Sequence, residues 1–262
     1  MTLNPLIPVL CADEVFLPMA QAISGRISSP VVRRLADIDG HYYLRVDAQG
    51  VALCQCGAKA PGPVFVDFSE GKARHRRLQG GGKGQLIARA VGLNKVSSPS
   101  VLDATAGLGQ DAWVLASLGC TVHLLERSAI VAALLIDGWQ RALTSSDGDV
   151  ASIATRMTVE SSDALTYLLS AQAPVADVIY LDPMYPHSKK TAAVKKEMSS
   201  FRDIVGTDED SGDLLAAALE KARYRVVVKR PRIGAFLGGR APATQLSGKS
   251  SRYDIYTLKK MG

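Results

Sequence analysis

Two glycines and a glutamate are spaced as in sites that hold a nucleoside. Gly107 and Gly109 follow the apolar segment 101–105, and Glu126 ends the next apolar segment, about twenty residues further on. Glycines let the backbone approach a ligand closely, and a helix that starts after them offers unpaired N–H donors. A carboxylate at the position of Glu126 can accept hydrogen bonds from both ribose hydroxyls. This spacing predicts a nucleoside-binding site.

Two cofactors fit this arrangement. The segment Gly107-Leu-Gly109-Gln-Asp-Ala112 matches the glycine fingerprint of dinucleotide-binding proteins, so NAD is one candidate. Asp103, however, places a carboxylate four residues before Gly107, where it would lie poorly beside a pyrophosphate. The same carboxylate suits the amino-bearing tail of S-adenosylmethionine, so charge favours the methyl donor. Ser161 and Ser162 end a third apolar segment, where they could contact the adenine.

A second motif indicates the reaction. The apolar segment 178–181 ends in Asp182-Pro183-Met184-Tyr185. This motif resembles the Asp/Asn-Pro-Pro-Tyr signature of methyltransferases that modify exocyclic amino nitrogens of nucleobases or a side-chain amide. Such an amine is a poor nucleophile because its lone pair is delocalised. Asp182 and the carbonyl near Pro183 can accept hydrogen bonds from its two N–H groups and so orient the lone pair toward the methyl group. Tyr185 can stack on the base.

A narrower resemblance covers Met184, which replaces the second proline of that signature. Seven segments are similar to those of the ribosomal small subunit methyltransferase J family: Phe65-Val-Asp-Phe68, His75-Arg-Arg77 with Gly80-Gly-Gly82, Asp103-Ala-Thr-Ala-Gly-Leu-Gly109, Leu125-Glu-Arg127, Tyr180-Leu-Asp-Pro-Met184, Val194-Lys-Lys-Glu-Met198 and Val226-Val-Val-Lys-Arg-Pro231. That family uses S-adenosylmethionine to methylate the N2 amine of one guanine near the 3′ end of small-subunit ribosomal RNA. By position, the resemblance implies that the donor is bound by Gln110, Asp111, Glu126, Arg127, Ser161, Ser162 and Asp182.

Basic residues concentrate where a polyanion could be held. Between Gly71 and Leu102 there are seven basic residues and no acidic one, so this stretch carries +7 and the rest of the chain sums to −1. Side chains that pair with phosphates release condensed counterions, which favours nucleic-acid binding, although a solvated loop explains such a run equally well. The residues predicted to bind RNA are Arg74, Arg76, Arg77, Lys83, Lys189, Lys190, Lys195, Lys196, Lys229 and Arg230.

Alternating strands and helices must position these motifs. Strands are predicted at residues 101–105, 121–125, 157–160, 178–181 and 226–228, with helices between them and an antiparallel strand at 252–258. We therefore predict an α/β fold, with a Rossmann-like sheet of seven mostly parallel strands as in class I S-adenosylmethionine-dependent methyltransferases. The carboxyl ends of its strands should form the ligand crevice.

The first part of the chain has a different pattern. Residues 31–51 contain short segments typical of a hairpin, residues 63–68 alternate like a strand, and a helix is expected over residues 83–91, ending at Gly92. We predict a small α+β region over residues 1–96, a candidate for RNA binding, followed by a methyltransferase domain over residues 97–262.

Composition excludes several other classes of protein. Hydrophobic residues make up 47% and charged residues 21% of the 262 residues, which is typical of globular chains. No apolar run approaches the roughly 18 residues of a membrane span, and residues 1–25 lack the basic start of a signal peptide. We therefore expect a cytoplasmic protein with no membrane partner. The spacing of Cys and His predicts no metal site.

Three alternatives to RNA methylation remain open. A DNA amino-methyltransferase would share the Asp182 motif, although the sequence has no recognisable target-reading domain. An NAD-dependent oxidoreductase would use the Gly107 loop but leaves residues 182–185 unexplained. A noncatalytic RNA-binding module would use the basic residues but not the donor site. The expected partner is small-subunit ribosomal RNA, either free or in the assembled small subunit.

Overall fold

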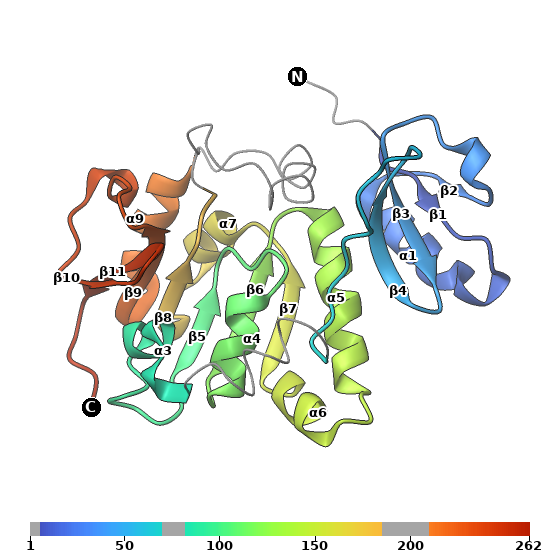
Figure 1. Ribbon diagram of the computed structural model, residues 1–262. Coiled ribbons are helices and arrows are strands. Elements are labelled where there is room, and N and C mark those ends of the chain that lie inside the picture. Colours follow the sequence, from blue (N-terminus) through green and yellow to red (C-terminus); the bar gives the residue numbers. More distant parts are fainter. Residues whose placement is uncertain (1–5, 70–81, 185–209) are drawn as a thin grey trace.

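The computed structural model describes residues 6–69, 82–184 and 210–262, which form two β-sheets with their covering helices. A four-stranded sheet near the N-terminus lies beside a seven-stranded sheet built from the later part of the chain (Figure 1). Among these residues, no helix is long and apolar enough to cross a membrane.

The seven-stranded sheet carries the glycine loop and the Asp182 motif at the ends of its strands. The quoted segments at residues 75–77 and 194–198 lie outside the described residues. Its strands are β5 (Ser100–Asp103), β6 (Thr121–Glu126), β7 (Met157–Ser161), β8 (Ala176–Leu181), β9 (Ala222–Pro231), β10 (Thr244–Ser247) and β11 (Ser251–Thr257). They lie in the order β10-β11-β9-β8-β5-β6-β7. Strands β5 to β9 run parallel, and β11 is antiparallel to both β9 and β10. The predicted α/β class, the seven strands and the antiparallel strand near the C-terminus are confirmed.

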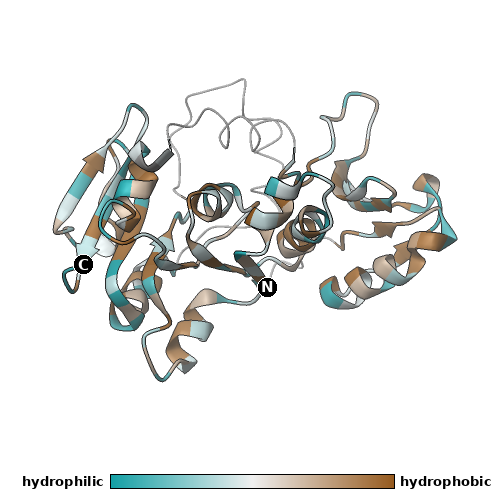
Figure 2. Ribbon diagram, turned by 90° about the horizontal axis from the view of Figure 1, so that it is seen from below, coloured by the Kyte–Doolittle hydropathy of each residue, from teal (hydrophilic) through white to brown (hydrophobic). Residues whose placement is uncertain are grey.

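Both faces of this sheet are buried, which explains why its strands read as continuous apolar runs. Successive residues belong to two separate cores: Val101, Leu124, Tyr180 and Val227 to one, and Leu102, Leu125, Leu181 and Val228 to the other. The first core is covered by α3 (Leu86–Val91), α4 (Gln110–Ser117), α5 (Ala129–Leu143) and α6 (Gly148–Ala154). The second is covered by α7 (Ala164–Ser170) and α9 (Ser211–Lys221). Figure 2 shows hydrophobic residues in both the strands and the helices that cover them.

The ends of several helices are fixed by the residues that flank them. Ser128 accepts the N–H of Val131 at the start of α5, and Asp163 accepts the N–H of Thr166 at the start of α7. These side chains satisfy donors that the first turn of a helix leaves unpaired. Helix α3 follows a short 3-10 turn, η3 (Gly82–Gly84), and ends at Gly92, whose φ of +91° suits glycine, as the sequence predicts.

The N-terminal sheet is small and mixed. Its strands are β1 (Val9–Leu10), β2 (Val31–Val32), β3 (Tyr42–Asp47) and β4 (Gly50–Gln55), in the order β2-β1-β3-β4. Helix α1 (Leu17–Ile27) and two 3-10 turns, η1 (Glu14–Phe16) and η2 (Leu35–Asp37), complete this region, while a further turn, η4 (Leu237–Gly239), packs against α9. The expected hairpin is confirmed, since β3 and β4 pair antiparallel.

The strand predicted at residues 63–68 is wrong for most of its length. Only Val64 pairs with the sheet, in an isolated bridge to Leu53. The apolar residues that follow are buried against helices: Phe68 stacks on Trp113 of α4 with ring centroids 4.5 Å apart, and Val66 packs against Gly138 of α5. The alternating apolar residues are therefore buried against helices α4 and α5 and do not form a strand.

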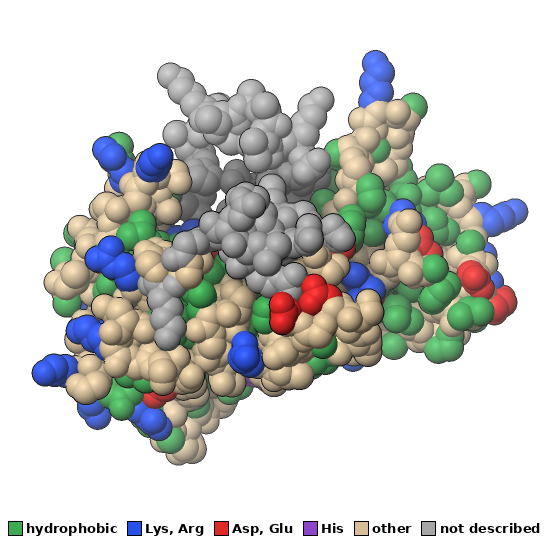
Figure 3. All heavy atoms as spheres, turned by 60° about the horizontal axis from the view of Figure 1, so that its bottom comes forward, with side chains coloured by type: hydrophobic (Ala, Val, Ile, Leu, Met, Phe, Trp, Pro, Cys, Tyr) green, Lys and Arg blue, Asp and Glu red, His purple; other side chains and the backbone are tan. Residues whose placement is uncertain are grey.

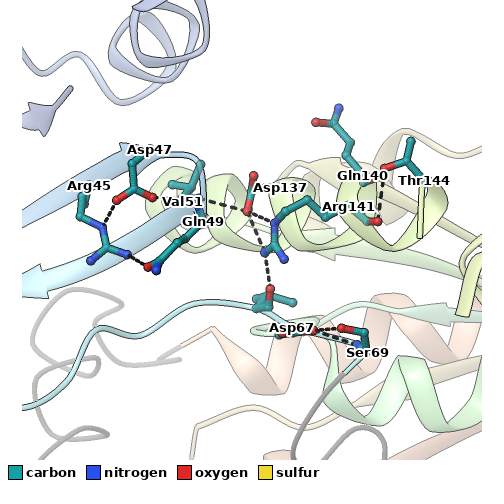
Figure 4. Close-up of polar contacts among 11 residues, drawn as sticks. Arg45, Asp47, Gln49, Val51, Asp67, Ser69, Asp137, Gln140, Arg141 and Thr144 are labelled. Carbon is teal, nitrogen blue, oxygen red and sulfur yellow. Dashed lines mark hydrogen bonds and ion pairs between the residues drawn. The ribbon is translucent and has the colours of Figure 1, made fainter. Parts of the chain in front are cut away.

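A buried polar network joins the N-terminal sheet to α5 (Figure 4). Asp137 accepts the backbone N–H of Val51 at 3.1 Å and the Nε–H of Arg141 at 2.9 Å, and Arg141 also donates to the carbonyl of Val66. A Cβ on Gly138 would lie 2.5 Å from Cγ1 of Val66, so the close approach requires glycine.

The division of the chain after residue 96 stays a prediction. Helix α3, which precedes that boundary, packs against β9, β10 and β11.

Candidate active site

The two predicted motifs meet because their strands are neighbours. Strands β5 and β8 pair in parallel, with Asp103 opposite Tyr180, so the loops that follow both strands emerge at the same edge of the sheet. One hydrogen bond joins these loops directly: the backbone N–H of Asp182 donates to Oγ1 of Thr105 at 2.6 Å. The glycine loop and the Asp182 motif therefore form one site.

The two glycines of the loop serve different purposes. Gly107 has a φ of +53°, and a Cβ there would meet no atom within 4 Å, so this position faces open space as a ligand-facing glycine should. A Cβ on Gly109, whose φ is +71°, would lie 2.7 Å from Cδ1 of Leu135 and 3.1 Å from Cζ of Phe68. The sequence-based reason for Gly109 is therefore corrected: glycine is needed there for packing inside the protein.

Glu126 anchors the glycine loop from the end of β6. Its side chain is buried, and its carboxylate accepts the N–H of Gly107 at 2.8 Å and the N–H of Ser128 at 2.7 Å. A carboxylate oxygen has two lone pairs, so these contacts are compatible with accepting ribose hydroxyls as well. Glu126 is thus held at the mouth of the loop, as its spacing predicts.

Ser161 and Ser162 lie beside Glu126. Ser161 is exposed at the end of β7, in register with Glu126, and Ser162 donates its N–H to the carbonyl of Glu126 at 3.0 Å. The following Asp163 caps α7, and the Thr166 N–H that it accepts lowers the pKa of its carboxyl. The structure therefore brings both serines to the edge where the donor is expected.

Gln110 and Arg127 flank the site on two other elements. Gln110 is exposed as the first residue of α4. Arg127, which follows β6, forms an ion pair with Asp210 at 3.1 Å, next to the start of α9. This pair links the ends of β6 and α9 across the same edge of the sheet.

A lysine lies between two carboxylates at the centre of the site. Nζ of Lys229 is 2.6 Å from Oδ2 of Asp111 and 2.8 Å from Oδ2 of Asp182, and the hydroxyl of Tyr180 donates to the same Asp111 oxygen at 2.8 Å. Desolvation raises the pKa of Asp182, and the Lys229 ammonium opposes that rise. Burial opposes the charge of Lys229, but Asp182 and Asp111 outweigh it and raise the pKa of the lysine.

Asp103, the last residue of β5, is a further carboxyl near this cluster. It is almost completely buried, and its Oδ1 accepts the N–H of Thr105 at 3.2 Å. Burial raises its pKa to about 8, with the carboxylates of Asp111 and Asp182 adding to the effect. The site therefore contains one carboxyl that burial keeps protonated at neutral pH and others that interact with Lys229.

The residues predicted to contact RNA have mixed positions. Arg230 differs from the exposed rim that the sequence predicts, because it is buried and its guanidinium donates to the carbonyl of Ala235 at 3.1–3.2 Å. Lys229 is paired within the site, as described above. For Lys83 the structure gives only a backbone position, in η3. Outside the described residues lie Arg74, Arg76, Arg77, Lys189, Lys190, Lys195 and Lys196, together with the predicted base-stacking Tyr185.

Two residues of the site were not predicted from the sequence. Thr105 receives the Asp182 N–H, and Tyr180 donates to Asp111. Both belong to the quoted motifs, but their roles depend on β5 and β8 being neighbours. Pairing of the two motif-bearing strands is the signal that would have identified them. Pro183 is buried directly after Asp182, where it sets the course of the loop.

The character of the site fits a cationic methyl donor. Besides the buried Asp103, the carboxylates of Asp111, Glu126 and Asp182 lie around the ends of β5, β6 and β8, and such a set would repel the pyrophosphate of a dinucleotide. Among the described residues, no group of three or more Asp, Glu, His or Cys side chains is arranged to hold a metal ion.

Comparison with known proteins agrees with this fit. A family model described as "Putative SAM-dependent methyltransferase" matches residues 33–258. The ribosomal RNA small subunit methyltransferase J of Cellvibrio japonicus is 50% identical over 264 residues, covering 97% of this chain and 98% of that protein. Its counterpart from Pseudomonas fluorescens is 54% identical over 255 residues, covering 97% and 96%. The crystal structure of a SAM-dependent methyltransferase from Neisseria gonorrhoeae is 39% identical, with a TM-score of 0.70 and 95% of each chain covered.

These matches confirm the resemblance seen in the sequence motifs, the class I methyltransferase fold and S-adenosylmethionine as the cofactor. They also exclude two of the three alternatives, because an NAD-dependent oxidoreductase and a noncatalytic RNA-binding module both disagree with relatives that are methyltransferases. The chain belongs to the ribosomal RNA small subunit methyltransferase J family of S-adenosylmethionine-dependent methyltransferases.

Proposed function

We propose that this enzyme transfers the methyl group of S-adenosylmethionine to the exocyclic N2 amine of one guanine in small-subunit (16S) ribosomal RNA. One observation carries the proposal: the Asp182 carboxylate stands at the end of β8, joined to the glycine loop through Thr105 and paired with Lys229. An acceptor carboxylate beside a donor site is what methylation of an amine needs. The names of the relatives support ribosomal RNA as the substrate.

The chemistry follows from the position of Asp182. When bound, S-adenosylmethionine supplies an electrophilic methyl group on a sulfonium. The Asp182 carboxylate and the carbonyl near Pro183 accept hydrogen bonds from the two N–H groups of the amine. This orients the nitrogen lone pair toward the methyl group. As the N–C bond forms, the S–C bond breaks, and the extra proton on nitrogen leaves to water. Tyr185 stacks on the flipped guanine in this proposal.

The residues around the glycine loop would hold the donor. Glu126 would accept hydrogen bonds from the ribose hydroxyls, and Asp103 and Asp111 would hold the amino-bearing tail. The loop at Gly107 and Gly109 would leave room for the donor, and Gln110, Arg127, Ser161 and Ser162 would contact the nucleoside. Support comes from the ends of β5, β6 and β7, which bring these residues to one edge of the sheet.

The RNA would be held by basic residues near that edge. The proposed phosphate contacts are Arg74, Arg76, Arg77, Lys83, Lys189, Lys190, Lys195 and Lys196. Lys229 and Arg230 are no longer among them, because Lys229 pairs with two carboxylates and buried Arg230 donates to the carbonyl of Ala235. Figure 3 shows Lys and Arg side chains distributed over the end of the molecule that carries β9 to β11. We also propose that residues 1–96 contribute to RNA binding, and that the enzyme acts in the cytoplasm on free RNA or on the assembled small subunit.

The Asp182→Ala variant tests the catalytic assignment. It should lose methyl transfer by at least about a hundredfold in kcat, because the amine is no longer oriented, while the fold remains intact. Transfer of labelled methyl groups and thermal unfolding measure the two effects. Asp177→Ala is a matched control, because Asp177 lies at the opposite end of the same strand, where it accepts the N–H of Ser100. Near wild-type turnover of Asp182→Ala would refute the mechanism.

The DNA amino-methyltransferase is the remaining rival, because it would use the same motif. Methylation of duplex DNA under conditions in which ribosomal RNA is not methylated would favour that rival.

A further inference from the structure

Lys229 was predicted to contact RNA phosphates, but its position suits another role. Its side chain is only 26% exposed, and its ammonium donates to Asp111 and to Asp182 at 2.6 and 2.8 Å. Lys229 lies on β9, which pairs with β8, so the strand register itself brings it beside the residue that follows Leu181. A phosphate would have to compete with two carboxylates for this ammonium.

Charged side chains from three elements, α4, β8 and β5, lie around Lys229. Asp111 lies on α4, Asp182 follows β8, and Asp103 ends β5. Arg230 follows on the same strand and also lowers the pKa of Asp182, by less than Lys229 does. In the described part of the chain, the other titratable groups here are the hydroxyls of Tyr180 and of Tyr253, the residue opposite Lys229 on β11.

We propose that Lys229 is a positioning residue that keeps the Asp182 carboxylate ionised and fixes its direction for the incoming amine. This inference rests on the proposed function, because it gives Asp182 the role of amine acceptor. A protonated Asp182 would offer an O–H donor where two N–H groups need an acceptor. With Asp103 and Asp111 close by, three carboxyl groups would share the site, and loss of the ammonium would favour protonation of one of them.

The contact with Asp111 gives the ammonium a fixed place. Asp111 is held in turn by the Tyr180 hydroxyl, and Tyr180 is among the most deeply buried side chains of the sheet. Hydrogen bonds thus run from buried Tyr180 through Asp111 and Lys229 to Asp182 at the reacting edge. Such a chain restricts the rotamer of Asp182 in the way that precise orientation of an amine requires.

The test compares the pH dependence of kcat/KM for wild-type enzyme and the Lys229→Met variant. A neighbouring cation lowers a carboxyl pKa by about one to three units. Removing it should therefore move the midpoint of the acidic limb upward by at least about one pH unit. Lys229→Arg retains a positive charge and should return the midpoint close to the wild-type value. If the midpoint in Lys229→Met equals that of the wild type while only thermal stability falls, the proposal is overturned and the lysine is merely structural.

Lys221→Met is the matched control. Lys221 also lies partly buried, but its ammonium donates to the carbonyl of Ala171, at the end of α7 and away from the carboxylates. This variant should lose some stability and keep the acidic midpoint of the wild type. An equal shift in both lysine variants would mean that the pH profile reports general destabilisation, which contradicts the proposal.

A measurement without RNA separates this inference from the proposed function. Carboxyl ¹³C NMR titration follows the Asp182 pKa directly, with Asp182→Asn used to assign the resonance. A higher pKa in Lys229→Met supports the inference even if ribosomal RNA proves to be the wrong substrate. An unchanged pKa in an enzyme whose wild type methylates guanine would overturn the inference and leave the proposed function standing.

Discussion

At the scale of single residues, the site separates carboxyl groups by their surroundings. Asp103 is buried, and the Lys229 ammonium lowers its pKa by less than burial raises it, whereas Asp182 is within 2.8 Å of that ammonium. Burial disfavours the charged form of a carboxyl, and a nearby cation favours it. Side chains of one chemical type can therefore have different protonation states within one site.

Replacement of Asp103 by Asn should change how stability depends on pH. Folding raises the Asp103 pKa from 3.8 to about 8, so the folded protein retains a proton that the unfolded chain loses between these values. The stability that this group contributes is complete below about pH 4 and is lost as the pH rises through about 8, by up to about 5 kcal/mol. Asp103→Asn should flatten this decline, because the neutral amide still accepts the Thr105 N–H.

Urea unfolding between pH 5 and pH 9 measures this effect. Asp149→Asn is the control, because Asp149 is exposed on α6, and its decline should match that of the wild type. If Asp103→Asn loses stability with rising pH as steeply as the wild type does, the buried carboxyl is not responsible for the decline.

The sequence predicted the site residues that belong to recognisable motifs. Glu126 could be found from its separation along the sequence from Gly107, and Asp182 from the prolines and the tyrosine that follow it. The ion pairs of Lys229 could not be predicted, because a lysine near the end of a strand looks like a solvent-facing charge unless Asp111 and Asp182 are known to face it. The pairing of β9 with β8 and the packing of α4 bring this lysine beside the two carboxylates.

At the scale of elements, packing inside the protein explains why the second position of the glycine loop is glycine. Gly109 begins α4 with a φ of +71°, pressed against Leu135 of α5 and Phe68. Gly109→Ala should destabilise the protein by about 1–3 kcal/mol, because the methyl group overlaps Leu135 and the backbone is strained.

Gly148→Ala is the matched control for that substitution. Gly148 opens α6, and a Cβ there would meet no atom within 4 Å. Alanine at this position should be neutral or stabilise by up to about 1 kcal/mol. The free energy of unfolding in urea compares the two variants, and equal values for both would contradict the packing role of Gly109.

Elements with a regular pattern were predictable, and those defined by tertiary contacts were not. The buried strands β5, β6 and β8 have apolar runs that the sequence shows directly. Strand β10, with the residues Thr-Gln-Leu-Ser, is polar and exists because β11 pairs with it. The two-residue strands β1 and β2 are too short to carry a period.

At the scale of the whole molecule, the N-terminal sheet is fixed to the methyltransferase sheet through α5. Asp137 is buried and connects Val51 of β4 with Arg141. Asp137→Ala should destabilise the protein by about 2–4 kcal/mol, because it leaves the Val51 N–H and the Arg141 guanidinium without this acceptor.

Thermal and urea unfolding measure that loss, with Asp149→Ala as the control. The exposed Asp149 carboxylate should change stability by less than about 0.5 kcal/mol. A stability of Asp137→Ala within that range would show that the two sheets are held together by other contacts. The sequence could not predict this junction, because Asp137 and Val51 are 86 residues apart.

The identity of the methylated nucleotide tests the central claim most directly. Pure enzyme is incubated with labelled S-adenosylmethionine and, separately, with naked ribosomal RNA, assembled small subunits and duplex DNA, and the labelled nucleotide is mapped by mass spectrometry. The account predicts N2-methylguanosine at a single position of small-subunit ribosomal RNA, in at least one of its two forms. Label on an adenine or cytosine of DNA, or on another atom of the RNA, would contradict it.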